Sequence, residues 1–278
     1  MYELVRRDFH KIRPVFQDIE RGRPFIYSLI EGNNEFSSTE CRIGVDDIHD
    51  PSSVFIHGGV GHYIAGETDS DAFNKAVEEY LLTQVIPARS ASGGNLLINT
   101  FSDEWKALID EMLREYGVKD AIRYVFDFDE ALYRERHSDW RTRIPEGYHI
   151  RRIDRELAER DFLGGAWRTV DGFLQGGFGF CIMKGEERIS VCDTVFVGDH
   201  RAETSIVTEE RYRRQGFGTL ACCAYLDHCL ACGIRPKWGT FFEPAIQMAK
   251  KLGFVEREHF PISHLWFPPP SKKSVQSG

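Results

Sequence analysis

Two hydrophobic periods alternate along the first half of the chain and predict a mixture of strands and helices. The apolar runs SSVFIHG (52–58) and HYIAGE (62–67) are typical of short strands. Residues 69–85 instead place apolar side chains at the three- and four-residue spacing of a helix. These side chains are Phe73, Ala76, Val77, Tyr80 and Leu81. The other elements expected in this half are helices over 8–20 and 102–117 and strands over 95–101 and 121–128.

The second half is predicted to begin with a meander of strands and to continue with alternating helices and strands. The polar turns KGEER and GDHR separate three apolar runs, which favours antiparallel pairing. The expected strands lie at 177–183, 189–197, 202–208, 237–241, 254–257 and 262–267, and the expected helices within 150–162, up to about 174, and over 219–232 and 243–253.

The same order of elements recurs in the two halves: strand, strand, helix, strand, helix, strand. It appears over 53–127 and again over 189–257. We therefore interpret the fold as α/β (α+β), with an N-terminal domain that is hypothesised to be a degenerate copy of the C-terminal one. A chain of 278 residues predicts two domains, and the charged stretch 134–149 is the expected boundary. The predicted parts are a domain over 1–140, a domain over 145–267 and a mobile tail over 268–278.

The overall composition narrows the possible partners. A formal net charge of −8 and a pI of about 5.7 argue against nucleic-acid binding and suit a small cationic substrate such as an amine. No run approaches the ~20 apolar residues that a membrane span needs. The start MYELVRRDFH lacks the apolar core of a signal peptide, so we expect a cytoplasmic protein whose seven cysteines are free thiols.

A cluster of arginines and glycines comes directly before the helix expected at 219–232. The start of a helix carries unpaired N–H groups and a partial positive charge, which attract phosphate. Gly216 and Gly218 allow a close approach, and Arg213 and Arg214 add positive charge. The stretch predicts either a diphosphate cradle or a plain loop with a glycine helix start. It matches neither the P-loop nor the dinucleotide-binding pattern.

The segment IVTEERYRRQGFGT resembles the acetyl-CoA-binding segment of the GNAT N-acetyltransferases, whose signature here is Arg213-x-x-Gly216-x-Gly218. The order of elements over 145–267 is similar to that fold, and MAKKLGF resembles the family's later helix. The two-domain layout resembles the group that includes the zwittermicin-resistance acetyltransferases.

This resemblance implies direct transfer of an acetyl group from acetyl-CoA to the amine of a small molecule, without a metal. The implied contacts of the pantetheine arm are the backbones of Ile206, Val207 and Thr208. The implied pyrophosphate contacts are Arg213, Arg214, Gln215, Gly216, Phe217, Gly218 and Thr219. Phe242 and Ala249 stand where the family often has Asn and a Tyr general acid. A CoA-sensing or protein-binding module and a peptide N-acetyltransferase therefore stay open as alternatives, and the oligomeric state is open.

Three carboxylates are candidate catalytic groups. Strand alternation is expected to place Asp193 on one face with Ile189, Val191, Val195 and Val197. There it either meets a partner such as an arginine or points into a cleft.

Glu203 opens the next strand, where the family often has a base, and the alternative is an exposed charge at a strand end. Glu243 precedes the later helix and is either catalytic or a partner of the helix dipole.

The four cysteines at 222, 223, 229 and 232 are expected to pack the helix against a sheet rather than to bind metal. They would lie on or beside one helix, whereas a structural zinc site usually draws paired ligands from two elements. A nucleophile formed by Cys229 and its neighbour His228 is also disfavoured, because adjacent residues on a helix point apart.

Overall fold

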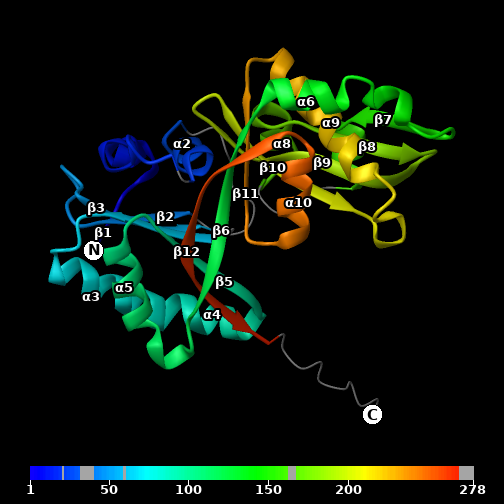
Figure 1. Cartoon of the computed structure of the whole chain (residues 1–278). Helices are drawn as coiled ribbons and strands as arrows, with labels where there is room; N and C mark the ends of the chain where they lie inside the picture. The colour runs from blue at the N-terminus through cyan, green and yellow to red at the C-terminus, as the bar shows by residue number, and fades with distance from the viewer. Residues whose placement is uncertain (21, 32–40, 59–60, 162–166, 269–278) are drawn as a thin grey trace, which may run out of the picture. The chain divides into compact units, whose positions relative to one another are not determined.

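Two units interleave along the chain in the computed structural model (Figure 1). The described residues are 1–20, 22–31, 41–58, 61–161 and 167–268. Unit 1 takes its described residues from 1–18, 41–121 and 261–268, and unit 2 from 19–31 and 122–260. The sequence predicted contiguous domains instead, and the segment expected to divide them lies inside unit 2. All but the first residue of the expected tail lies outside the described residues.

The sheet of unit 1 contains one parallel pair among antiparallel neighbours. Its strands follow the order β1-β2-β3-β4-β5, with the end of β12 beside β5. β4 and β5 run parallel, and the other neighbours run antiparallel. The strands are β1 (Tyr2–Glu3), β2 (Arg42–Val45), β3 (Ser53–Gly58), β4 (Gly61–Gly66), β5 (Gly94–Thr100) and β12 (Phe254–Phe267).

The helices of unit 1 cover this sheet around a core that includes Phe73, Trp105 and Ile98. The indole N–H of Trp105 donates to the carbonyl of Gly66 at 2.8 Å, which ties α5 to the end of β4. The helix expected over 8–20 is instead a 3-10 helix followed by one short α-helix. The helices are η1 (Arg6–Ile12), α1 (Arg13–Phe16), α3 (Asp71–Tyr80), the π-helix η2 (Leu81–Val85), α4 (Ile86–Ser92), α5 (Asp103–Met112) and η3 (Arg114–Tyr116).

The sheet of unit 2 follows the order β12-β6-β11-β10-β9-β8-β7. β10 and β11 are parallel, whereas β7 to β10 form the predicted antiparallel meander and β6 is antiparallel to β11. β12 is one continuous strand where the sequence predicted two. The strands not yet given are β6 (Lys119–Phe128), β7 (Tyr148–Arg152), β8 (Gly179–Lys184), β9 (Glu187–Gly198), β10 (Arg201–Thr208) and β11 (Arg235–Thr240).

The helices of unit 2 are dominated by α9, which packs against β8 to β11 (Figure 1). None of the described helices is both long and apolar enough to cross a bilayer. The helices are α2 (Arg23–Glu31), α6 (Glu130–His137), η4 (Trp140–Arg143), α7 (Arg155–Arg160), α8 (Val170–Gly176), η5 (Glu210–Tyr212), α9 (Phe217–Ala231) and α10 (Glu243–Lys251).

The helix α6 was not expected, because its sequence is charged and buries only Tyr133 and His137. The Tyr133 hydroxyl donates to Asp227 of α9 at 2.7 Å, and the indole of Trp140 donates to the same carboxylate at 3.0 Å. The segment that looked like a linker is therefore fastened to α9.

The recurring order of elements predicted from the sequence is confirmed. In unit 1 the antiparallel β3 and β4 lead through α3 to the parallel β5, and in unit 2 β9 and β10 lead through α9 to β11. The two helix starts differ. Ser70 caps α3 by accepting from the N–H of Phe73, whereas Gly216 precedes α9 without a side-chain cap. The start of α9 therefore lacks the side-chain cap that the start of α3 has.

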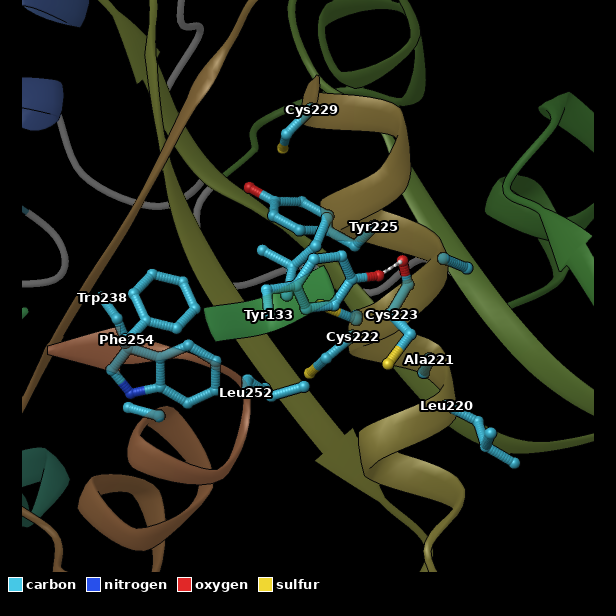
Figure 2. Close-up of a cluster of buried hydrophobic side chains, with 14 of the residues drawn as sticks. Tyr133, Leu220, Ala221, Cys222, Cys223, Tyr225, Cys229, Trp238, Leu252 and Phe254 are labelled. Carbon is cyan, nitrogen blue, oxygen red and sulfur yellow. Dashed lines mark hydrogen bonds between the residues drawn. The ribbon is translucent and has the colours of Figure 1, made fainter. Parts of the chain in front are cut away.

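Cysteines fill the core beneath α9 (Figure 2). Cys222, Cys223 and Cys229 are fully buried among aromatic side chains that include Tyr133 and Trp238. Cys232 lies just past the helix end and is exposed, so the expectation of packing fails for this one residue. Among the described residues, no group of three or more metal-binding side chains comes together.

We expect Cys222→Ala to lower the free energy of unfolding by about 1–2 kcal/mol, because it leaves a small cavity in a fully packed core. Cys232→Ala is the matched control on an exposed cysteine and should stay within about 0.5 kcal/mol of wild type. Urea denaturation measures both. Equal stabilities, or stoichiometric zinc that Cys222→Ala abolishes, would contradict a packing role.

Candidate active site

A gap between two parallel strands defines the candidate site. β10 and β11 pair only over Arg201–Glu203 and Arg235–Lys237, although β10 continues to Thr208. The strands therefore separate after Glu203, and the later part of β10 has no ladder partner on that side. Open backbone groups at a sheet gap are available to hydrogen-bond an extended ligand.

Glu203 reaches across the start of this gap. Its Oε1 accepts a hydrogen bond of 2.9 Å from the backbone N–H of Gly239, two residues past the last pair on β11. Burial raises the pKa of Glu203 above its ordinary value, and the charge of Arg123, the Gly239 N–H and Lys237 oppose that rise. Glu203 is thus a partly buried carboxylate with a raised pKa, which is what a general base needs. It is not the exposed strand-end charge that was the alternative.

The loop before α9 has the backbone geometry of an anion cradle. Arg214 and Gly216 both adopt positive φ, at 60° and 91°. No hydrogen-bond acceptor for the N–H groups of Phe217, Gly218 and Thr219 occurs among the described residues. Open N–H groups at the start of a 15-residue helix attract a phosphate group.

The arginines of the loop differ in what they contact. The Arg213 Nε donates to the carbonyl of Thr208 at 3.1 Å, which fastens the loop to the end of β10. Arg211 pairs with Glu187. Arg214 is exposed and makes no hydrogen bond or ion pair within the described chain, and Gln215 bonds the Arg211 carbonyl at 3.0 Å. Arg214 is therefore the arginine whose charge is most available to a ligand.

The strand end and the helix start approach each other closely. A Cβ on Gly218 would lie 3.1 Å from the Thr208 hydroxyl and 3.4 Å from the Met248 methyl group, so glycine permits this contact. Ile206 packs into the core under α9, whereas the side chain of Val207 is 53% exposed. The end of β10 thus presents an apolar side chain beside the open helix start.

Asp193 is buried on β9, which lies on the other side of β10 from the gap. Its partner is Ser205, directly opposite on β10, and not an arginine ion pair. Burial raises its pKa to about 7, while the Ser205 hydrogen bond and the charge of Arg188 oppose the shift.

The expected common face of Ile189, Val191, Asp193, Val195 and Val197 is wrong. The register slips between Ala202 and Thr204 and again beside Met183, and the core under α9 contains both Ile189 and Cys192.

The later helix, α10, has no proton donor at position 249, where the family resemblance implies a tyrosine acid. Ala249 is fully buried in the core, and Phe242 is 56% exposed and stacks on Phe241. Glu243 begins α10, where its carboxylate accepts from Gln247 at 2.6 Å. Its place in the first turn fits a partner of the helix dipole.

Arg123 and Gly239 are two residues of the site that sequence reasoning missed. They border Glu203 from β6 and β11. The signal was weak, because β6 belongs to the first half of the chain and only the pairing of β6 with β11 brings Arg123 here.

Comparisons with known proteins agree on one family. The family model described as GNAT acetyltransferase matches residues 14–262. The chain is 25% identical to the uncharacterized N-acetyltransferase YdfB of Bacillus subtilis over 263 residues, 91% of this chain and 94% of that protein.

Solved structures share the fold. A GCN5-related N-acetyltransferase-like protein from Streptococcus suis aligns with a TM-score of 0.69 and 21% identity, over 94% of this chain and 98% of that chain. A tandem GNAT protein from the clavulanic acid biosynthesis pathway aligns with a TM-score of 0.57 and 11% identity, over 94% of each chain.

Proposed function

Because this chain belongs to the GNAT acetyltransferase family, we propose that it transfers an acetyl group from acetyl-CoA to the amine of a small molecule. The observation that carries this proposal is the uncapped start of α9 beside the gap between β10 and β11. The start offers N–H donors for a diphosphate, and the gap offers backbone groups for an extended arm. A carboxylate with a raised pKa stands at the same gap.

Acetyl-CoA is proposed to bind along the end of β10 and the loop. The backbones of Ile206, Val207 and Thr208 would bond the pantetheine arm. The pyrophosphate would meet the N–H groups of Gly216 to Thr219 and the charge of Arg214, with Gln215 beside them. Arg213 contributes by holding the loop against Thr208.

The proposed reaction is direct transfer. Glu203, or a water next to it, takes a proton from the ammonium, because only the neutral amine has a lone pair. The amine nitrogen bonds to the thioester carbonyl carbon, and an N–H near Val207 stabilises the oxyanion. The nitrogen, now positively charged, loses its second proton to water, the carbon–sulfur bond breaks, and the thiolate takes a proton from solvent. Because a thiol has a pKa near 8.5, the thiolate can leave without a proton from a tyrosine acid, which Ala249 replaces in this chain.

The other two carboxylates have secondary roles in this proposal. Asp193 positions Ser205, which lies between Glu203 and Val207 along β10. Glu243 is the next candidate base if Glu203 proves dispensable.

A second candidate function is a CoA-binding module with an impaired transfer site. The buried Ala249 and the stacked Phe242 favour it, because neither supplies a proton donor. An acetyl-CoA thiol-release assay over small amines, amino-polyols and peptides separates the candidates. Release with small amines supports the proposed enzyme, release with peptides alone supports a peptide acetyltransferase, and tight acetyl-CoA binding without any release supports the module.

We expect Gly216→Trp to weaken acetyl-CoA binding about 100-fold. The indole would occupy the open space above the helix start and displace about two charge-assisted hydrogen bonds. Calorimetry with acetyl-CoA measures the affinity.

Gly233→Trp is the matched control at the other end of α9. Gly233 also has positive φ, at 65°, and open space around its Cα, so this variant also carries backbone strain. It should bind acetyl-CoA normally. Equal affinities of the two variants for acetyl-CoA would show that acetyl-CoA does not bind at the loop before α9.

A further inference from the structure

The surroundings of Glu203 bear on which amines the site accepts. Arg123 lies on β6, two residues along the strand from Val125, which pairs with Gly239 of β11. A Cβ built on Gly239 would lie 3.0 Å from Nη2 of Arg123 and 3.1 Å from Oε1 of Glu203. A side chain at residue 239 would be crowded against both groups, so the guanidinium of Arg123 and the carboxylate of Glu203 lie close together beside Gly239.

Neighbouring basic groups are already paired with carboxylates. Lys237 is buried and binds Asp127, and Arg257 binds the same carboxylate at 3.2 Å. Arg123 has no carboxylate within 4.0 Å among the described residues, so it does not form an ion pair even with Glu203. Arg123 is partly exposed, so its charge is available to a ligand.

We propose that Arg123 binds a carboxylate of the acceptor, so that the acceptor is an amino acid or a similar amine with an acid group a few bonds away. This inference rests on the proposed function, in which Glu203 receives the amine. A planar guanidinium holds a carboxylate through two parallel N–H bonds, whereas Glu203 repels an acid group and attracts an ammonium. The two side chains thus fix the orientation of the acceptor at both ends.

The separation of the two groups limits the acceptor. Both approach within about 3 Å of one point, so the amine and the acid of an acceptor that meets both lie on the same small fragment. The free α-amino acids are the simplest amines of this kind. Phosphate-bearing amines present a similar anion and are distinguished by the test.

The test compares each amino acid with its own amide in the acetyl-CoA thiol-release assay. The amide lacks the carboxylate and has a less basic amine, so the rates are compared at equal concentrations of the neutral amine. Wild type should prefer the acid by about 10- to 100-fold in kcat/KM, mainly through KM. Arg123→Gln should abolish this preference. Arg123→Lys should restore part of it, because lysine keeps the positive charge but lacks the two parallel N–H donors of a guanidinium.

Arg123 also lowers the pKa of Glu203, so removing it changes the rate with both members of a pair. The ratio of acid to amide cancels that effect and reports the carboxylate contact alone. Arg155→Gln is the matched control, since Arg155 is an exposed arginine of the same unit that pairs with Asp171 and Glu159. It should keep the wild-type ratio.

Equilibrium binding supplies a second readout that needs no turnover. With CoA present, calorimetry should detect the N-acetylated acid with wild type, and about 10- to 100-fold weaker binding of it to Arg123→Gln. The N-acetylated amide should bind both proteins equally weakly. Circular dichroism establishes that the variant is folded.

The outcomes separate the two proposals. If Arg123→Gln keeps the wild-type ratio of acid to amide, or if aminophosphonates alone are preferred, the carboxylate assignment is overturned and acetyl transfer stands. If no amine is acetylated, the proposed function fails, and the binding measurement still decides whether Arg123 recognises a carboxylate.

Discussion

Replacing Glu203 by glutamine is expected to reduce kcat at neutral pH by about 10²- to 10⁴-fold, the range that a positioned general base contributes. Glutamine has the same shape, and its amide oxygen can still accept the hydrogen bond from Gly239, so the gap between the strands is preserved. Acetyl-CoA affinity should be nearly unchanged, because the carboxylate lies at the start of the gap and not in the loop that precedes α9.

The pH profile identifies the role of the lost group. Glu203 accepts a proton only when ionised, and burial raises its pKa, so wild-type kcat should fall as the pH drops through that raised value. In Glu203→Gln this limb should be absent, and the rate should rise with pH as the amine itself becomes neutral. Glu130→Gln, on an exposed glutamate of α6 that pairs with Arg134, is the control. Wild-type kcat in Glu203→Gln from pH 6 to 9 would exclude Glu203 and make Glu243 the next residue to replace.

Asp193→Asn is expected to stabilise the protein at pH 8 by up to about 4 kcal/mol relative to wild type. Burial raises the Asp193 pKa from 3.8 to about 7 in the folded protein, and each unit is worth about 1.4 kcal/mol. Between these two values the folded state holds a proton that the unfolded state has lost. The contribution of Asp193 to stability is therefore complete below about pH 4, declines as the pH rises, and is gone above about pH 7.

Urea denaturation of wild type and Asp193→Asn at intervals from pH 4 to 8 measures this difference. The other titrating groups, such as the buried His62, whose pKa burial lowers to about 3, occur in both proteins and cancel in the comparison. Asp171→Asn changes an exposed carboxylate on α8. Its free energy of unfolding should therefore vary with pH in parallel with that of wild type. A parallel curve for Asp193→Asn as well would mean that Asp193 is ionised in the folded protein.

The elements that could be predicted from the sequence are those whose signals are local. The α9 start followed from Gly216 and the apolar run behind it, and the meander from two polar turns between apolar runs. A helix period, a strand period and a turn each depend on neighbouring residues, so they can be recognised without knowledge of the fold. The proposed diphosphate cradle belongs to the same class, because one loop and the helix after it would provide all its groups.

The tertiary structure alone decided which distant groups meet. The sequence of α6 is too charged to predict this helix. The helix is held in place by Asp227 of α9, about 90 residues later in the chain. Slips in register turned the side chains of β9 away from their expected faces. The meeting of Glu203, Gly239 and Arg123 depends on three strands, and β6 enters this sheet from the other half of the chain. Strand pairing over such separations is set by the packing of the whole unit, and no local pattern records it.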